Sequence, residues 1–434
     1  MNKIPLVFWG NRWLVVETQD TWHRIDYNQP QRITPGAIMF GLRRQFLLDP
    51  AITFLNHGSF GATPRPVFQT YQHWQRELEY QPVEFLGRRF SDLMLTARQS
   101  LAELLATDAG NLVFTRNVTE AMNIVAHSLC LGKGDEVLST NHEYGAIDRM
   151  WRFLSKERGF RYINLQIPVT ITSSQLFIET LWKGVSARTR VISISHITSP
   201  TSILFPVQPV ARRARKAGII TVVDGAHAPG QIPMKLDDLG VDFYSGNLHK
   251  WLCAPKGAGF LFSRPEVQHL LKPLIVSWGF EAENPGPSRF IDHHEWTGTC
   301  DIAAYLSVPA AIKFQKDNNW EEVRHACGVL AHDILLDICE LTDQDSFEQP
   351  DPGHSGNALQ MVSAPLPATT DLPALKTLLY EKYRIEVPLI LWNGRKLIRV
   401  SVQGYNTRKE AKKLVAALRE NLELPGGKVP FSPK

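Results

Sequence analysis

The sequence is poor in cysteine and has no long apolar run. Its 434 residues include five cysteines, an odd number, and none of them stands in a C-x-x-C pair. That scarcity argues against a disulfide framework and against a cysteine metal cluster, and it favours a reducing compartment, which we expect to be the cytoplasm. No apolar run reaches the length needed to cross a bilayer. Residues 1–38 lack the basic start, apolar run and small-residue cleavage site of a secretory signal.

A strong charge of either sign is also missing. The formal net charge is +4, and no block of lysine and arginine resembles a stripe that tracks phosphates. The basic run at 212–216 is typical of the solvated face of a helix. His293-His294-Glu295 does not predict a metal site, because adjacent histidines do not share one helix face. We therefore expect a small-molecule substrate, and neither nucleic acid, membrane nor metal as a partner.

The composition is that of an ordinary globular protein. With 44% hydrophobic and 21% charged residues, a chain of this length can bury a large core and carry a second, smaller domain. For residues 1–38 two interpretations stay open: a disordered extension, or an artefact of start-site choice with Met39 as the true start. We predict five parts, namely the extension 1–38, an N-terminal segment 39–62 that packs with the small domain, a large domain 63–305, a small C-terminal α+β domain 306–425 and a tail 426–434.

Short β-rich runs alternate with helical patterns through the first two thirds of the chain. The regular order of strand then helix indicates an α/β fold with a mostly parallel central sheet covered on both faces. Strands are predicted at 111–115, 136–139, 161–165, 190–195 and 219–223, with shorter candidates at 242–245 and 259–262. Helices are predicted at 119–131, 145–158, 174–187 and 207–217. No G-x-G-x-x-G follows the first predicted strand, which disfavours a nicotinamide dehydrogenase.

Polar and ionisable residues come directly after these apolar strands, where ligands bind in open α/β sheets. Asp224 ends the most apolar strand. A half-buried carboxylate there needs a cationic partner, such as a protonated pyridine nitrogen, although it could also cap the following turn. Lys250 follows the next short strand. A lysine in a low-dielectric pocket loses affinity for its proton and forms imines readily, whereas the alternative is an exposed surface lysine.

Two further strand-end residues suit an aromatic phosphate ligand. Thr119 opens a predicted helix, whose free N–H groups and the threonine hydroxyl would bind a phosphate, and a plain helix cap is the alternative. His142 follows the strand at 136–139 and could lie flat on an aromatic ring, or it could be a structural histidine. Each signal is weak alone, but their joint occurrence at strand ends predicts one shared site.

Over about residues 45–410 the chain resembles the class V aminotransferase-like enzymes that depend on pyridoxal 5'-phosphate (PLP), and it is most similar to their isopenicillin N epimerase branch. The resemblance implies the PLP-dependent transferase-like fold, fold type I, with 63–305 as the PLP-binding domain. The motifs that carry it are Phe54-Leu-Asn-His-Gly-Ser-Phe-Gly61, Val83-Glu-Phe-Leu-Gly-Arg-Arg89, Asn117-Val-Thr-Glu120, His142-Glu-Tyr-Gly145, Val223-Asp-Gly-Ala-His227, Gly246-Asn-Leu-His-Lys-Trp251, Trp296-Thr-Gly-Thr299 and Arg399-Val-Ser.

The resemblance also implies roles for individual residues. Lys250 corresponds to the Schiff-base lysine, Asp224 to the partner of the pyridine nitrogen, and Arg399 to the arginine that grips the substrate α-carboxylate. Thr299 resembles a residue that reaches the phosphate of the neighbouring subunit, which implies a homodimer. The other implied cofactor-binding residues are His227 at the ring oxygen, His142 stacked on the ring, and Thr119, Val118, His249, Ser245, Asn247 and Ser199.

For the reaction, the resemblance implies chemistry at the α carbon of an amino acid or of a substrate that contains one. Epimerisation is the first hypothesis, with Lys250 as one proton carrier and His142 or Tyr144 as candidates for the second. A C–S β-lyase and a class V aminotransferase are the alternatives, and a catalytically silent binding protein is disfavoured by the intact Lys250, Asp224 and Arg399. The stretch 383–399 lacks the mobile cysteine of cysteine desulfurases, which argues against persulfide formation.

Overall fold

The computed structural model of the chain describes residues 6–9, 12–15, 42–286, 288–347, 349 and 359–423. The chain divides into two units, 1–34 and 35–434. In the first unit, β1 (Leu6–Trp9) pairs antiparallel with β2 (Arg12–Val15). The rest of the predicted extension 1–38 and the predicted tail 426–434 lie outside the described residues.

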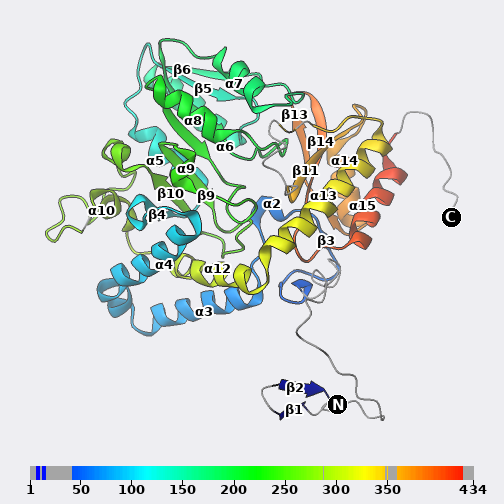
Figure 1. Cartoon of the computed structure of the whole chain (residues 1–434), viewed down its shortest axis with the longest axis horizontal. Coiled ribbons are helices and arrows are strands. Elements are labelled where there is room, and N and C mark those ends of the chain that lie inside the picture. The colour runs from blue at the N-terminus through cyan, green and yellow to red at the C-terminus, as the bar shows by residue number, and fades with distance from the viewer. Residues whose placement is uncertain are drawn as a thin grey trace. The chain divides into compact units, whose positions relative to one another are not determined.

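A seven-stranded sheet forms the centre of the second unit (Figure 1). Its strand order is β4-β10-β9-β8-β7-β5-β6, and every neighbouring pair is parallel except the two that include β10. This confirms the predicted, mostly parallel sheet. The strands are β4 (Leu112–Thr115), β5 (Glu136–Thr140), β6 (Arg161–Leu165), β7 (Thr189–Ser195), β8 (Ile220–Asp224), β9 (Phe243–Asn247) and β10 (Gly259–Ser263).

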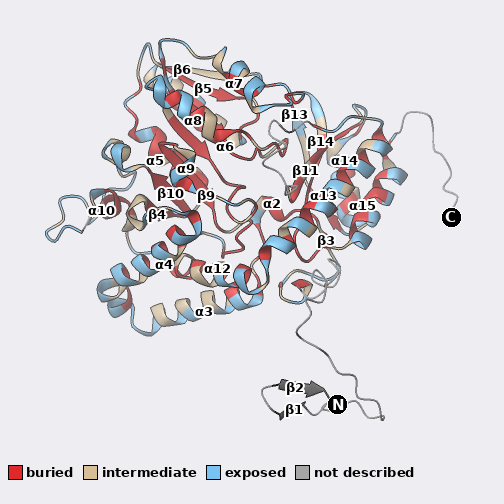
Figure 2. Cartoon of the chain, in the orientation of Figure 1, coloured by how far each residue is buried: buried red, intermediate tan, exposed pale blue. Residues whose placement is uncertain are grey.

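Both faces of this sheet are buried, as Figure 2 shows for its strands. Side chains alternate between the faces, so Val137, Val191 and Val222 share one apolar cluster while Leu138, Ile192 and Val223 belong to another. The first cluster is closed by α5 (Val118–Ser128), α6 (Gly145–Arg158) and α10 (Arg289–Glu295). The second is closed by α4 (Phe90–Leu105), α7 (Ser174–Trp182) and α8 (Val207–Lys216). The remaining helices before the C-terminal part are α3 (Arg65–Tyr80), α9 (Leu236–Leu239), α11 (Ala303–Leu306) and α12 (Val308–Asp317).

The start of α5 and the end of α7 differ from the sequence prediction. Helix α5 begins at Val118 because the Asn117 side chain accepts a hydrogen bond from the Glu120 N–H at 3.0 Å, as an N-cap does. Helix α7 ends at Trp182, five residues before its predicted end. A methyl group on Gly184 would lie 2.6 Å from the Leu138 side chain, so the chain passes close to β5 there.

The C-terminal part is built on a three-stranded antiparallel sheet, β11 (Met361–Leu366), β14 (Arg395–Ser401) and β13 (Leu389–Trp392), in that order. Its helices are α13 (Trp320–Thr342), α14 (Leu372–Glu381) and α15 (Arg408–Asn421). The predicted domain boundary at 305/306 assigns α12 to the small domain, but α12 packs on α3 and α4 of the large domain. Helix α13, by contrast, packs on β11.

The N-terminal segment lies against this C-terminal part. Strand β3 (Thr53–Phe54) pairs parallel with β12 (Ile385–Glu386), and Asn56 bridges to Ser401. The next element is the four-residue helix α2 (His57–Phe60), of which His57 and Gly58 are buried. Among the described helices, none combines the length and the apolar character that a bilayer-spanning helix needs.

Gly225, the residue after β8, has no room for a side chain. A methyl group added there would lie 2.1 Å from the buried Tyr244 ring. We expect Gly225→Ala to lower the free energy of unfolding by about 2 kcal/mol, the usual scale of overpacking. Urea unfolding monitored by circular dichroism measures this change. Gly132→Ala is the matched control, because nothing lies within 4 Å of its added methyl group, and equal losses in the two variants would contradict the steric explanation.

Candidate active site

A cavity of about 280 Å³ lies where the carboxyl ends of β7, β8 and β9 meet the start of α5. This is the edge of the sheet at which ligands bind in open α/β folds. It brings together segments that are far apart in the sequence. The lining residues are Ser59, Phe60, Arg116, Asn117, Val118, Thr119, Tyr144, Ser195, Ile197, Ser199, Asp224, Ala226, His227, Asn247, His249, Lys250 and Gly257.

Asp224 presents an unsatisfied carboxylate oxygen at this cavity. Its Oδ1 accepts a hydrogen bond from the Ala226 N–H at 2.9 Å, while Oδ2 is buried without a hydrogen-bond partner. Burial raises the pKa of the carboxyl group, against the lowering effects of the Ala226 N–H and of the charge on Lys250. A buried carboxylate with a free oxygen gains most from a cationic hydrogen-bond donor, which a protonated ring nitrogen would supply.

Lys250 carries an amine that loses its proton easily. Burial, and next the charge of Arg399, lower its pKa to about 7, although Asp224 acts in the opposite direction. The Lys250 Nζ lies 3.3 Å from Nε2 of His227, and the Trp251 indole N–H donates to Nδ1 of the same ring at 3.3 Å. Because Nδ1 accepts and burial keeps the ring neutral, with its pKa well below the usual value, the proton sits on Nε2. Nε2 is therefore a donor, directed at an unprotonated amine.

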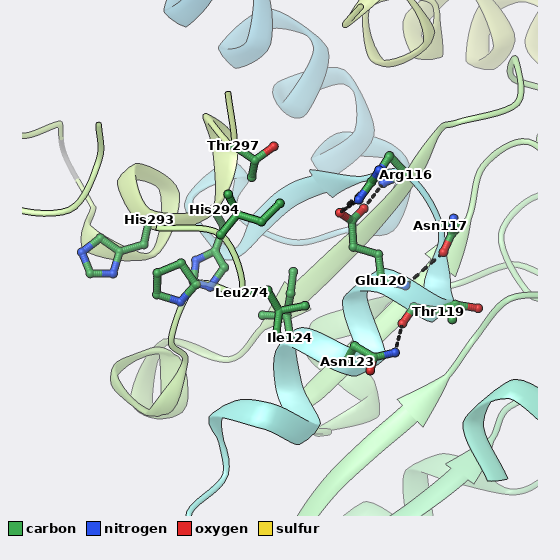
Figure 3. A pocket seen from close by; sticks show the side chains of 12 residues that line it. Arg116, Asn117, Thr119, Glu120, Asn123, Ile124, Leu274, His293, His294 and Thr297 are labelled. Carbon is green, nitrogen blue, oxygen red and sulfur yellow. Dashed lines mark hydrogen bonds and ion pairs between the residues drawn. The ribbon is translucent and has the colours of Figure 1, made fainter. Parts of the chain in front are cut away.

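The start of α5 forms another wall of the cavity, with Asn117, Val118 and Thr119. Figure 3 shows Asn117 and Thr119 from the side of a neighbouring pocket that they also line. The Asn247 side chain accepts a hydrogen bond from the Val118 N–H at 3.0 Å, which ties the helix start to the end of β9. Thr119 and His249 also line the cavity, and His249 uses Nδ1 for the Ala258 carbonyl at 3.0 Å. A helix start with a threonine hydroxyl is suited to binding a phosphate group.

Arg399 is buried and held at the cavity by two serines. Its Nη1 donates to the Ser199 carbonyl and hydroxyl oxygens at 2.8 and 2.9 Å, and its Nη2 donates to the Ser59 hydroxyl at 3.1 Å. Its Nε is buried without a hydrogen-bond partner. Burial lowers the pKa of this guanidinium to about 10, so the group stays charged at neutral pH and can bind a carboxylate.

A family model described as aminotransferase class V matches residues 54–414. The chain belongs to this family. Isopenicillin N epimerase from Amycolatopsis lactamdurans is 36% identical to it over 390 residues, 87% of this chain and 97% of that protein. The isopenicillin N epimerase from Streptomyces clavuligerus is 33% identical, covering 87% and 96%. Hercynylcysteine sulfoxide lyase from Schizosaccharomyces pombe is 25% identical, covering 84% and 93%.

Solved structures of the same architecture match nearly the whole described fold. The cystine C-S lyase C-DES in complex with cysteine persulfide gives a TM-score of 0.73 at 22% identity, covering 86% of this chain and 98% of that one. The cysteine desulfurase CsdA from Escherichia coli gives 0.73 at 21% identity, covering 88% and 98%. These matches confirm the predicted PLP-dependent transferase-like fold, fold type I.

PLP is the cofactor of this family, and the predicted cofactor is thereby confirmed. The residues of the class V site fit it, because the cavity has an amine of lowered pKa, a carboxylate oxygen without a partner and a helix start at separate places on its wall. Among the described residues, no group of three or more metal-ligating side chains occurs.

Most of the residues predicted for this class V site line its cavity, but four do not. Arg399 is one of them, although it bonds to Ser59 and Ser199, which do line the cavity. His142 is fully buried, with Nδ1 2.7 Å from the Thr201 hydroxyl and Nε2 2.8 Å from the Ile167 carbonyl oxygen. Ser245 donates to the Phe260 carbonyl at 2.7 Å. We therefore do not retain His142 or Ser245 as cofactor ligands. Thr299 is exposed and lines no part of this cavity in its own chain.

Tyr144, two residues after His142, does line the cavity. It stands at the N-cap position of α6 and is half exposed. The preceding Glu143 fixes this turn, because its carboxyl oxygens bond the Thr140 and Ser195 hydroxyls at 2.6 and 2.7 Å. Ser59 and Phe60, which come from the N-terminal segment, also line the cavity.

We expect covalent capture of PLP to follow the unprotonated fraction of Lys250. That fraction rises with pH, so the capture rate should be half-maximal near pH 7 instead of near the ordinary lysine value of 10.5. Absorbance changes after mixing PLP with the stripped protein across a pH series measure this rate. Borohydride reduction and peptide mass spectrometry should find the adduct on Lys250, none in Lys250→Ala, and a normal amount in Lys256→Ala. A midpoint near pH 10 would contradict the effect of burial.

Proposed function

We propose that this enzyme is a PLP-dependent epimerase that inverts the α carbon of an amino acid or of a substrate that contains one. The proposal rests on one observation above all, the pair of proton-carrying groups on either side of Asp224. Lys250 follows β9 and Tyr144 follows β5, and β8 with Asp224 lies between these strands in the sheet order. The identity of 36% to an isopenicillin N epimerase over most of both chains supports the same reaction type.

The residues that would hold the cofactor have distinct tasks. Asp224 Oδ2 would accept the hydrogen bond of the protonated ring nitrogen, His227 Nε2–H would donate to the ring oxygen, and the start of α5 at Thr119 would bind the phosphate. Bound PLP acts as an electron sink that weakens the bonds at the substrate's α carbon. Val118, Asn247, His249 and Ser199 complete the proposed binding set through their places around the cavity.

The remaining residues act on the substrate. Arg399 binds and orients the α-carboxylate, with Ser59 and Ser199 holding its guanidinium in place. Lys250 Nζ, whose pKa of about 7 leaves a large unprotonated fraction at neutral pH, removes or returns the proton at the α carbon from its own side. Inversion needs a second proton carrier on the opposite side of the α carbon. We assign the Tyr144 hydroxyl to this step.

A C–S β-lyase is the second candidate, because hercynylcysteine sulfoxide lyase is 25% identical over most of both chains. Persulfide formation has less support. The stretch 383–399 has no cysteine, and burial raises the pKa of the Cys253 thiol to about 12, which makes it a poor nucleophile.

In D2O, the wild type should exchange the α proton of its substrate and invert its configuration. Tyr144→Phe should keep exchange and lose inversion by at least about a hundredfold, the usual scale for a general acid or base. Proton NMR measures the exchange and chiral chromatography the inversion. Phe60→Leu, on the same cavity wall, is the control and should keep both. Release of pyruvate from cysteine conjugates with no inversion would favour the lyase, and inversion by Tyr144→Phe at the wild-type rate would remove Tyr144 from the mechanism.

We further propose that the enzyme acts as a homodimer, with Thr299 reaching the neighbouring site. A second cavity of about 430 Å³ adjoins the start of α5 and includes Leu274, Ile275 and Thr297 (Figure 3). The apolar segment that continues from it is exposed, with Val276 at 67% and Trp278 at 83%. An exposed apolar patch beside a cavity is typical of a protein interface.

Trp278→Ser should raise the dimer dissociation constant by about tenfold or more, because exposed tryptophans are frequent interface anchors. Light scattering during size-exclusion chromatography at several concentrations measures the dissociation. Tyr80→Ser is the control, since Tyr80 is a similarly exposed aromatic residue, at 89%, on another element, α3. An unchanged dimer in Trp278→Ser, or a wild type that is monomeric at all concentrations, would contradict the proposed interface.

A further inference from the structure

Helix α2 is wedged between the lysine loop and the C-terminal sheet. A methyl group on Gly61, directly after the helix, would lie 1.9 Å from the His249 carbonyl oxygen, and Gly61 has a φ of +70°, a conformation that favours glycine. A methyl group on Gly58 would lie 2.8 Å from the Ser401 hydroxyl of β14. In Figure 1, α2 accordingly lies between the large sheet and the C-terminal sheet. The helix cannot shift without moving the loop or β14.

His57 connects this helix to the main chain of Lys250. The ring is fully buried, its Nε2 lies 2.9 Å from the Lys250 carbonyl oxygen, and its Nδ1 lies 2.9 Å from the Tyr405 hydroxyl. Burial lowers the pKa of the ring to about 3, so it stays neutral. A carbonyl oxygen only accepts, so Nε2 carries the proton and Nδ1 accepts from Tyr405. The Gln403 amide nitrogen stands 3.3 Å from the same Nε2, but the shorter contact to the carbonyl decides the tautomer.

The same helix holds the other end of the site. Ser59, two residues after His57, accepts a hydrogen bond from Nη2 of Arg399 at 3.1 Å. One short helix therefore contacts both the main chain of the cofactor lysine and the guanidinium that we assign to the substrate carboxylate. We propose that His57 is a positioning residue, which through α2 fixes the Lys250 amine at a set distance from Arg399. His57 does not line the cavity and so acts through these two residues.

The affinity of the stripped full-length protein for PLP tests this role, because it needs no substrate. His57→Phe fills the space without an N–H, and we expect its dissociation constant to rise by about tenfold, as for one lost buried hydrogen bond. His57→Gln places an amide nitrogen near the position of Nε2, and it should return the constant to within about threefold of the wild type. Absorbance titration with PLP gives these constants, and urea unfolding gives the stability of each variant.

If His57 only fills the core, Phe and Gln will give the same PLP affinity, and that result overturns the proposal. Should His57→Phe fail to fold, Tyr405→Phe removes only the oxygen that bonds Nδ1. It should raise the PLP dissociation constant by about threefold, and an unchanged constant also overturns the proposal. The proposed role of His57 depends on PLP as the cofactor but not on epimerisation. A negative epimerase assay therefore does not contradict it. An unchanged PLP affinity in the variants, in turn, does not contradict the proposed epimerase reaction.

Discussion

The Asp224 carboxylate, buried at the end of a central strand with one oxygen unpaired, is the constraint on which the rest of the site depends. A desolvated carboxylate is costly unless a cation or a strong donor meets it. The same burial raises the pKa of Asp224 and lowers that of Lys250, so the two groups are poorly suited to neutralise each other as a simple ion pair. What satisfies both is a ligand that brings a protonated ring nitrogen to the acid and an electrophilic carbon to the amine, which describes PLP.

The fold supplies this arrangement through strand order. Asp224, the lysine loop and the Tyr144 turn come from β8, β9 and β5, whose carboxyl ends lie at one edge of the sheet. The helix start at Thr119 follows β4, which β10 separates from β9. The C-terminal sheet contributes Arg399 from β14, and the N-terminal segment closes the gap with α2. A site made of so many segments keeps its geometry only if the contacts between the segments are rigid. The close contacts of His57, of Ser59 and of the glycines in and after α2 meet this requirement.

Sequence reasoning succeeded where the local pattern and the tertiary structure agree. The predicted bounds of β6 and β8 agree with the structure to within one residue. A short apolar run with turn residues at both ends defines the position of a buried strand closely. The strand-end rule identifies the edge of the sheet but not which side chains line the cavity, and His142 and Ser245 do not line it. His142 packs against Trp392 at 4.6 Å between ring centres, a contact with a residue 250 positions later in the chain. Helix α12, which follows the predicted boundary at 305/306, packs on helices that precede it by more than two hundred residues.

The sequence by itself determined the fold class, the family and the cofactor, because short motifs and the period of the apolar residues specify each of these. Only the tertiary structure decided that Tyr144 and not His142 lines the cavity, that Asn247 accepts a hydrogen bond from the Val118 N–H, and that His57 contacts both the Lys250 carbonyl and Tyr405. Those facts depend on side-chain direction and on contacts between distant segments, and burial, not local propensity, sets the protonation states that follow from them.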